Sequence, residues 1–459
     1  MKRKIIAIVA LIVVFVLMMV SCTPYSDLFE SNGKNFCVGF GEREIALPTD
    51  TEEPLYIAGY KNGYEIEGVL DIPKAKATWI DTGESGVLLI GVDCVAVGSG
   101  TVDDIRQALS DFCGEVGCVS VNVYATHTHA GIDTLGLWGK VAIDGKNTDY
   151  MENLITAAVD AAKLAYEDRT IGELYYGSTE PKDILHDSRE PIEYDPMLHQ
   201  IRFKSNDASA NGIRLLSYAA HAESLRGDNT LLSADFPGAL ADEIKRSTGD
   251  DVMYMPAAIG GLIMTKELVE PFDAVENMRK TAELLATSVL SIKDEEKLDP
   301  SLSISSMEID LPLDNTYFFF GKFLGILNNE ISSGESETGY MLQSELGVLK
   351  LGNVALALIP GEIFPELVSG NGLGDEDPES LESIAKRCGI EKLLIVGLCN
   401  DEIGYIVPKS AFKLNDELPY IEPVEDGSGE NHYEETNSVG IHTAEIIAEG
   451  FEKLLGLMK

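Results

Sequence analysis

The stretch VSVNVYATHTHAG, residues 119–131, decides how the rest of the chain is interpreted. Its first seven residues are apolar enough for a buried strand, and His127 and His129 follow directly. Side chains of a strand alternate between its two faces, so histidines two residues apart are expected on the same face. They would stand at the carboxyl end of the strand, where open α/β sheets place ligand and metal sites. The spacing alone leaves two interpretations open, a metal site or two hydrogen-bonded polar residues.

The composition indicates a globular protein that does not bind nucleic acid. The chain has 459 residues, of which 45% are hydrophobic, enough for one large core or two moderate ones. Its formal net charge of −41 opposes binding to nucleic acid and other polyanions, and leaves neutral or cationic substrates open. None of the six cysteines beyond Cys22 lies in a C-x-x-C pair, so a zinc site built from thiolates is not expected.

The first residues are typical of an export signal. Three basic residues, Lys2 to Lys4, precede an apolar run over residues 5–20 that is short for a membrane span. Ser21-Cys22 then resembles a bacterial lipobox, in which Cys22 becomes the acylated first residue of the mature protein. The alternative is an uncleaved membrane anchor, which leaves the body on the same side of the membrane. We expect a signal peptide over residues 1–21, a tether over 22–36, and a folded domain over 37–459 that is lipid-anchored outside the cytoplasm.

Apolar strands that lead into polar turns recur along the chain, with helices between them. Strands are predicted at residues 86–97, 119–125, 213–220, 354–359 and 393–398. Helices are predicted at residues 101–112, 148–167, 236–247, 274–290, 379–387 and 439–457, the first with a capping box formed by Thr101 and Asp104. This alternation predicts an α/β fold, with a mixed β-sheet core flanked by helices in one intertwined domain.

Further potential metal ligands stand just after these predicted strands: His221, Glu362 and Tyr405. With His127 and His129 they offer nitrogen and oxygen donors that suit Zn²⁺, which in catalytic sites keeps one position open for water. Such a site can hydrolyse amides or esters, because zinc lowers the pKa of its water to about 7 and polarises the carbonyl. Taken singly, each residue is better explained by a structural role: Glu362 as a carboxylate at a helix N-terminus, His221 as a hydrogen-bonded core histidine and Tyr405 as a half-buried aromatic residue.

Several groups of residues run in order across nearly the whole chain. They are Val38-Gly39-Phe40-Gly41, residues 126–131, Asp187-Ser188-Arg189 with Asp195-Pro196, Ala220-His221 with residues 233–238, Pro360-Gly361-Glu362, residues 400–405, and Tyr433-Glu434. As a set they resemble the catalytic domain of the neutral/alkaline, non-lysosomal ceramidases.

The resemblance implies a zinc-dependent hydrolase of linear amides, such as the N-acyl bond of a sphingolipid. The lipobox-like Ser21-Cys22 separately predicts that this hydrolase is tethered to the membrane through Cys22. The resemblance also implies one zinc ion held by these residues: His127, His221, Glu362 and Tyr405. His129 would orient water or stabilise the oxyanion, together with Tyr405, and Arg189 would contact the small-molecule or lipid substrate. Glu402, three residues before Tyr405, is the alternative fourth donor.

The sequence departs from the family pattern in two places. The ceramidases carry a serine in a Gly-Asp-rich loop after the second zinc histidine, and the comparable residues 256–265 contain none. Because a helix is predicted after Tyr433, we do not expect the carboxyl-terminal β-domain of the longer ceramidases in these residues. We therefore expect the fold and the metal site to be retained, while the acyl length and head group of the substrate stay open.

Three other interpretations compete with this one. A metallo-β-lactamase-like site needs Asp and His four and five residues after the first histidine, where this chain has Gly131 and Ile132. An amidohydrolase barrel carries its His-x-His on the first strand, whereas here the pair follows about ninety residues of the folded domain that is predicted to begin at residue 37. The third alternative is a non-catalytic surface lipoprotein that binds a lipid or glycan with a retained metal site. The missing loop serine favours this alternative, and the presence of all four presumed ligands opposes it.

Overall fold

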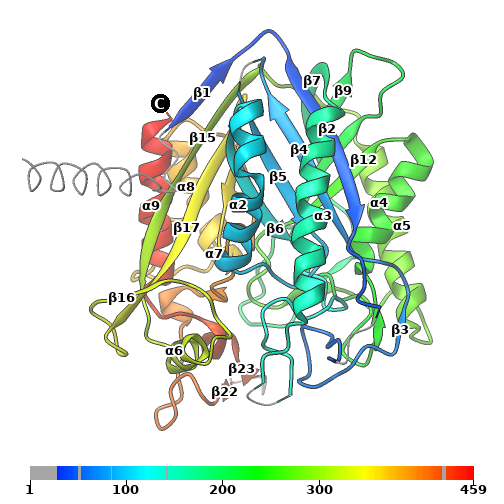
Figure 1. The fold of residues 1–459 in the computed structure, drawn as a ribbon. Helices are drawn as coiled ribbons and strands as arrows, with labels where there is room; N and C mark the ends of the chain where they lie inside the picture. Colours follow the sequence, from blue (N-terminus) through cyan, green and yellow to red (C-terminus); the bar gives the residue numbers. More distant parts are fainter. Residues whose placement is uncertain (1–27, 50–52, 84, 141–142, 426–430, 459) are drawn as a thin grey trace, which may run out of the picture.

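The computed structural model describes residues 28–49, 53–83, 85–140, 143–425 and 431–458 (Figure 1). The predicted signal peptide and Cys22 lie outside the described residues. Within the described ranges, every helix is too short or too polar to cross a bilayer.

The larger of two main sheets has nine strands and is mixed, as predicted. Its order is β12 (Asp251–Pro256), β10 (Ile213–Tyr218), β9 (Leu198–Ser205), β7 (Thr170–Thr179), β2 (Phe36–Glu44), β4 (Lys74–Asp81), β5 (Gly86–Val92) and β6 (Cys118–Ala125), with β14 (Glu296–Lys297) beside β7. The pairs β5/β6 and β10/β12 are parallel, and the remaining pairs are antiparallel.

The smaller sheet has six strands. Its order is β1 (Phe29–Asn32), β15 (Ser301–Pro312), β17 (Tyr340–Leu351), β18 (Val354–Leu358) and β20 (Lys392–Val396), with β16 (Ile331–Ser333) beside β17. Only β18 and β20 are paired in parallel among these described strands. Because β1 pairs with β15 from Phe29 to Asn32, the folded body begins before residue 37, and the tether predicted for residues 22–36 is wrong over this part. A four-residue edge strand is too short to show a period in the sequence.

The two sheets face each other across a shared apolar core. Leu89 of β5 and Leu356 of β18 point into this core, whereas their neighbours Leu88 and Ala355 face the helices outside. The larger sheet is covered by α2 (Ser99–Val116), α3 (Thr148–Glu167), α4 (Asp235–Thr248) and α5 (Ala274–Ser291), and the smaller by α7 (Pro365–Ser369), α8 (Leu381–Arg387) and α9 (Thr443–Leu457) (Figure 1). The result is a layered sandwich of helices, two sheets and helices. This confirms the predicted fold class and is not the barrel of the amidohydrolase alternative.

Short elements complete the chain around these layers. They are β3 (Gly68–Val69), β8 (Leu185–Asp187), β11 (Leu231–Leu232), β13 (Ile263–Thr265), α6 (Thr316–Phe323), β19 (Glu362–Ile363), β21 (Tyr405–Ile406), β22 (Val424–Glu425), β23 (Asn431–His432) and the 3-10 helices η1 (Lys409–Ala411) and η2 (Glu434–Asn437). Most of them follow a strand of a main sheet and carry or support the candidate site.

The start of one helix is fixed by residues close in the sequence, and the start of another by a distant residue. The bounds of α3 match the prediction, since its apolar positions repeat at helical spacing and Asn147 accepts a hydrogen bond from the Tyr150 backbone N–H. Helix α2 begins at Ser99, before the predicted capping box at Thr101. Its first turn is capped instead by Asp401, whose Oδ1 accepts from the Ser99 backbone N–H at 2.9 Å. A cap supplied from 302 residues away leaves no local signal in the sequence.

Candidate metal centre and active site

His127 and His129 lie together, but not because they share a strand. Strand β6 ends at Ala125, and His127 adopts φ 63°, a left-handed conformation that is uncommon for a residue with a side chain. The turn brings the two Nε2 atoms to 3.2 Å from each other. His127 Nδ1 lies 2.7 Å from the carbonyl oxygen of Val95, in a buried segment predicted to continue β5. The structure therefore confirms that the two rings converge and corrects the reason for it.

His221 follows β10 and completes the imidazole cluster from the same sheet. Its Nδ1 lies 2.8 Å from the carbonyl oxygen of Ile263, and its Nε2 lies 2.9 Å from Glu362 Oε2. A carbonyl partner requires a proton on Nδ1 of both His127 and His221, which leaves each Nε2 as the donor atom toward the centre. Burial alone lowers the pKa of His221, but the Glu362 carboxylate outweighs this effect and raises it to about 9.

Glu362 and Tyr405 come from the segments that follow β18 and β20 of the smaller sheet, where β19 and β21 form a separate two-stranded sheet. The two residues are register partners in the parallel pair β19/β21, so their side chains leave the backbone on the same side. Glu362 Oε2 lies 3.5 Å from His127 Nε2, and Tyr405 Oη lies 3.3 Å from Tyr433 Oη. The imidazoles of His127 and His221 hold the pKa of Glu362 well below its usual range in spite of burial. Burial and the Glu362 charge raise the pKa of Tyr405, so its hydroxyl keeps its proton.

The donor set fits a zinc ion on geometric grounds. Four ligands at about 2.0–2.1 Å from one tetrahedral zinc ion stand about 3.3–3.4 Å from one another. Two pairs of the predicted ligands, His127–Glu362 at 3.5 Å and His221–Glu362 at 2.9 Å, bracket that value, and His129 Nε2 lies 3.2 Å from His127 Nε2. Within the part of the chain that the structure describes, His127, His129 and His221 are the group of potential donors close enough to hold a metal, with their ligand atoms within 4.8 Å. The predicted ligands His127, His221 and Glu362 are thus brought together, and His129 joins them.

Arg189 lies near the site but is engaged elsewhere. Its side chain is buried, and its Nη1 and Nη2 lie 2.9 Å from Glu434 Oε2 and 3.0 Å from Glu435 Oε1. The guanidinium also stacks on Phe364 at 4.9 Å from the ring centroid. These contacts fix η2, the short helix directly after Tyr433, so Arg189 is placed as a residue that positions this segment. A direct contact between Arg189 and substrate stays a prediction.

Glu402, the alternative donor, is a buried carboxyl group beside the cluster. Its Oε1 accepts a hydrogen bond from the Gly404 backbone N–H at 2.8 Å, and its Oε2 is buried without a hydrogen-bond partner. Burial, followed by the charge of Glu362, raises the pKa of Glu402 well above its usual range. The protein therefore holds Glu402 as a neutral acid at the edge of the donor set.

Two residues that contact His129, Glu223 and Tyr60, were not predicted from the sequence. Glu223 Oε2 lies 3.9 Å from His129 Nδ1, which is buried and has no hydrogen-bond partner. The Tyr60 hydroxyl donates to Glu223, and the Tyr60 ring packs edge-on against His129 at 5.2 Å. Gly59, at φ 112°, lets the loop approach, since a Cβ there would lie 2.5 Å from His129 Nδ1. The spacing His221-x-Glu223 was a usable signal, whereas nothing local pointed to Tyr60.

The loop that lacks the serine has a structural part in the site. Residues 256–265 leave β12, and the carbonyl oxygen of Ile263 accepts the backbone N–H of His221 as well as facing its ring. Gly260 donates its backbone N–H to the carbonyl oxygen of Ile363, directly after Glu362. This loop therefore links the histidine of one sheet to the glutamate of the other.

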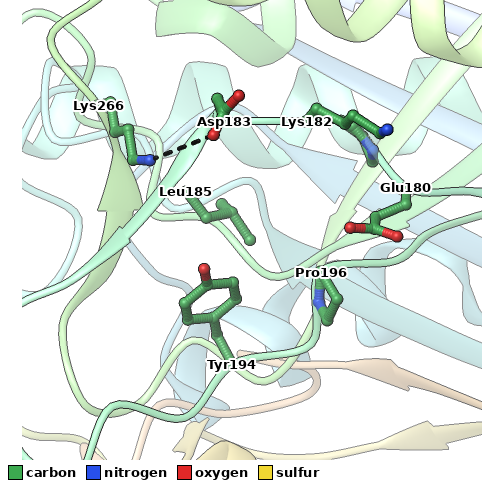
Figure 2. Close-up of a pocket in the computed structure, with 8 residues that line it drawn as sticks. Glu180, Lys182, Asp183, Leu185, Tyr194, Pro196 and Lys266 are labelled. Atoms are coloured by element: carbon green, nitrogen blue, oxygen red, sulfur yellow. Dashed lines mark ion pairs between the residues drawn. The ribbon is translucent and has the colours of Figure 1, made fainter.

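A separate polar cavity of about 230 Å³ opens on the surface near β8 and β13. Figure 2 shows Lys266 facing Asp183 across its upper rim, at 4.0 Å, with Tyr194 and Pro196 below. Its lining contains two lysines and two carboxylates, all partly open to solvent, and none of the imidazoles of the cluster. It is not the candidate active site.

The fold is similar to that of two solved structures. The chain is similar to a neutral ceramidase from Pseudomonas aeruginosa, with a TM-score of 0.71 and 14% identity over 92% of this chain and 74% of that chain. It is also similar to a ceramidase complexed with C2, with a TM-score of 0.68 and 14% identity over 92% of this chain and 75% of that chain. No family model and no curated protein matches the sequence. The fold is therefore that of the ceramidase catalytic domain, with a histidine-rich candidate metal centre between its two sheets.

Proposed function

We propose that this protein is a zinc-dependent hydrolase of linear amides with a ceramidase-like N-acyl lipid as its class of substrate. The observation that carries the proposal is the convergence of His127, His129, His221 and Glu362 within a fold shared with two ceramidases. Histidines from one sheet and a carboxylate from the other make a mixed nitrogen and oxygen site of the kind that zinc hydrolases use.

The metal ion and the residues around it would have different roles in the reaction. His127 Nε2, His221 Nε2, Glu362 and Tyr405 would hold the ion, which supplies a polarised carbonyl and a water of lowered pKa when bound. His129 Nε2 faces the same centre and is the group placed to take a proton from water and return it to the departing amine. Tyr433, whose hydroxyl is 3.3 Å from that of Tyr405, can donate a hydrogen bond to the developing oxyanion. Burial raises the pKa of Tyr433, which keeps this donor protonated.

The proposal also includes the location of the protein, which would be outside the cytoplasm and anchored to the membrane by a lipid. The basic residues, apolar run and Ser21-Cys22 at the amino terminus favour export and lipid anchoring at Cys22. Replacing Cys22→Ser should move the protein from the membrane fraction to the soluble fraction of the expressing cells. Retention in the membrane fraction would instead favour the uncleaved anchor.

A chelation experiment on the purified protein tests the function. Hydrolysis of N-acyl lipids of varied acyl length should disappear with chelator, return with added Zn²⁺, and be absent in His127→Ala. His442→Ala is the matched control, because His442 is exposed and lies outside the site. Turnover that is unaffected by the chelator would end the proposed mechanism.

The second candidate is a binding lipoprotein that keeps the fold and the metal. The absence of a serine from residues 256–265 favours it. It predicts stoichiometric zinc, measured by elemental analysis, together with no turnover of any amide or ester.

A further inference from the structure

Helix α6 exposes an apolar surface that the protein does not cover. Four large side chains are more than half exposed: Tyr317 at 53%, Phe320 at 59%, Phe323 at 64% and Leu324, just past the helix end, at 64%. At 100° per residue these four positions fall within an arc of about 120°. None of the residues of α6 is buried.

The opposite side of α6 is apolar as well and packs on the protein. The Phe319 ring lies 5.1 Å from the Tyr340 ring, and Phe318 reaches Gly404, where an added Cβ would lie 3.4 Å from the Phe318 ring. Large apolar side chains thus stand on two opposite sides of α6, and only the inner ones are covered by the protein among its described residues. An uncovered apolar face of this kind is typical of a docking surface.

The helix is fixed beside the exposed edge of the candidate site, at Tyr433. Asn315 caps its first turn and also donates from Nδ2 to the carbonyl oxygens of Thr436 and Ser438, at 2.9 and 2.8 Å. Those carbonyls belong to the segment that follows Tyr433, which is 38% exposed and forms the outer member of the Tyr405–Tyr433 pair. The exposed face of α6 and the exposed Tyr433 are thus held together by the hydrogen bonds of Asn315.

We propose that α6 docks on a lipid bilayer and presents the site to it, so that an N-acyl lipid reaches Tyr433 without crossing water. The identity of the lipid rests on the proposed function, whereas the docking does not. Aromatic side chains such as those of Tyr317, Phe320 and Phe323 favour the membrane interface.

A second copy of the chain fits this face less well. Two molecules of net charge −41 repel each other. The exposed area is on the order of a few hundred Å², below the roughly 800 Å² that each partner buries in a stable protein complex. The same net charge favours a zwitterionic over an anionic bilayer, so phosphatidylcholine vesicles are the appropriate probe.

Fluorescence quenching tests the docking at one position, independently of any tether at the amino terminus. The full chain carries two tryptophans, so a single F320W substitution adds a signal that can be isolated by subtraction. Vesicles of brominated phosphatidylcholine should quench the F320W signal by about half or more, because bromine quenches tryptophan only within the bilayer. The matched control is I171W on β7, a position 55% exposed, which should not be quenched. Equal or absent quenching at both positions, or quenching replaced by self-association in sedimentation, would overturn the proposal.

A kinetic comparison separates this proposal from the function on which its substrate rests. The triple variant F320S/F323S/L324S should lose about tenfold or more of the activity on vesicle-embedded N-acyl lipid and keep its activity on a soluble short-chain analogue. Equal activity of variant and parent on both substrates overturns the docking. Quenching at F320W without hydrolysis of either substrate supports the docking and contradicts the amidase function.

Discussion

The segments that follow strands of the two sheets contribute different types of ligand atom to one site. The larger sheet supplies His127, His129 and His221, and two of these rings face backbone carbonyl oxygens that orient them. The segments that follow β18 and β20 of the smaller sheet supply oxygen donors, Glu362 and Tyr405, placed by the two-residue parallel pairing of β19 with β21. Neither set is sufficient for a mixed nitrogen and oxygen zinc site. The site is therefore a property of the contact between the sheets, and a variant that breaks this contact, or removes a group from one side of it, should disturb the site.

Removing one donor from either side should have the largest effect. His127→Ala and Glu362→Gln should each lower kcat/KM by about 1,000-fold, or about 4 kcal/mol of transition-state stabilisation, because each leaves the ion with an incomplete ligand set. Steady-state kinetics and elemental analysis of the same preparations measure activity and bound zinc together. Full zinc occupancy with unchanged kcat/KM in either variant would remove that residue from the donor set.

Disrupting the contact between the two sheets should lower the stability of the fold before it lowers catalytic activity. Asn400 is buried between the sheets, where its Oδ1 accepts the Val123 backbone N–H at 2.9 Å and its Nδ2 donates to Glu345 at 2.9 Å. Asn400→Ala leaves these groups unsatisfied and should lower the free energy of unfolding by about 3 kcal/mol in urea titrations. Asn353→Ala, at an exposed site, serves as the control. Equal stability of the two variants would mean that Asn400 does not link the sheets energetically.

Glu366, in α7 on the smaller-sheet side, makes stability depend on pH. Burial, followed by the charge of Asp187, raises its pKa to about 7, above the 4.5 of the unfolded chain. The folded state then holds a proton that the unfolded state has lost, so stability falls as pH rises from about 4.5 to 7, by up to about 3 kcal/mol. Glu366→Gln should be more stable than the parent at pH 8 and show a flatter profile of melting temperature against pH.

The control for this profile is Glu382→Gln. Glu382 is a surface carboxylate that pairs with Lys386, so its replacement should leave the pH dependence unchanged. A Glu366→Gln profile that runs parallel to that of the parent would contradict the assignment.

The smallest expected effect lies on the larger-sheet side, behind His129. Glu223→Gln should lower kcat by about 10- to 100-fold with bound zinc unchanged, because Glu223 and Tyr60 orient the His129 ring. If Glu223 acts through His129, the double variant E223Q/H129A should be no slower than H129A. Additive losses would show an independent role. Tyr60→Phe should lose less than Glu223→Gln, and Tyr64→Phe, on the same loop, should lose nothing.

Much of the fold was predictable from the sequence, as was the closeness of three candidate ligands, His127, His221 and Glu362. The exceptions have specific physical reasons. Periodicity placed α3 and the strands before His127, His221 and Glu362, since alternation and helical spacing are properties of contiguous residues. The extent of the tether was wrong at β1, because an edge strand of four residues is recognised only through its partner β15.

The sequence by itself determined which residues carry nitrogen and oxygen donors and that each follows an apolar strand. Tertiary structure alone decided that the ends of β6, β10, β18 and β20 meet, that a left-handed turn joins His127 to His129, and that α6 keeps an uncovered face. Donor type and strand pattern are encoded within a few residues, whereas these contacts join segments separated by up to hundreds of residues. They form only when burial of the shared core brings the two sheets together.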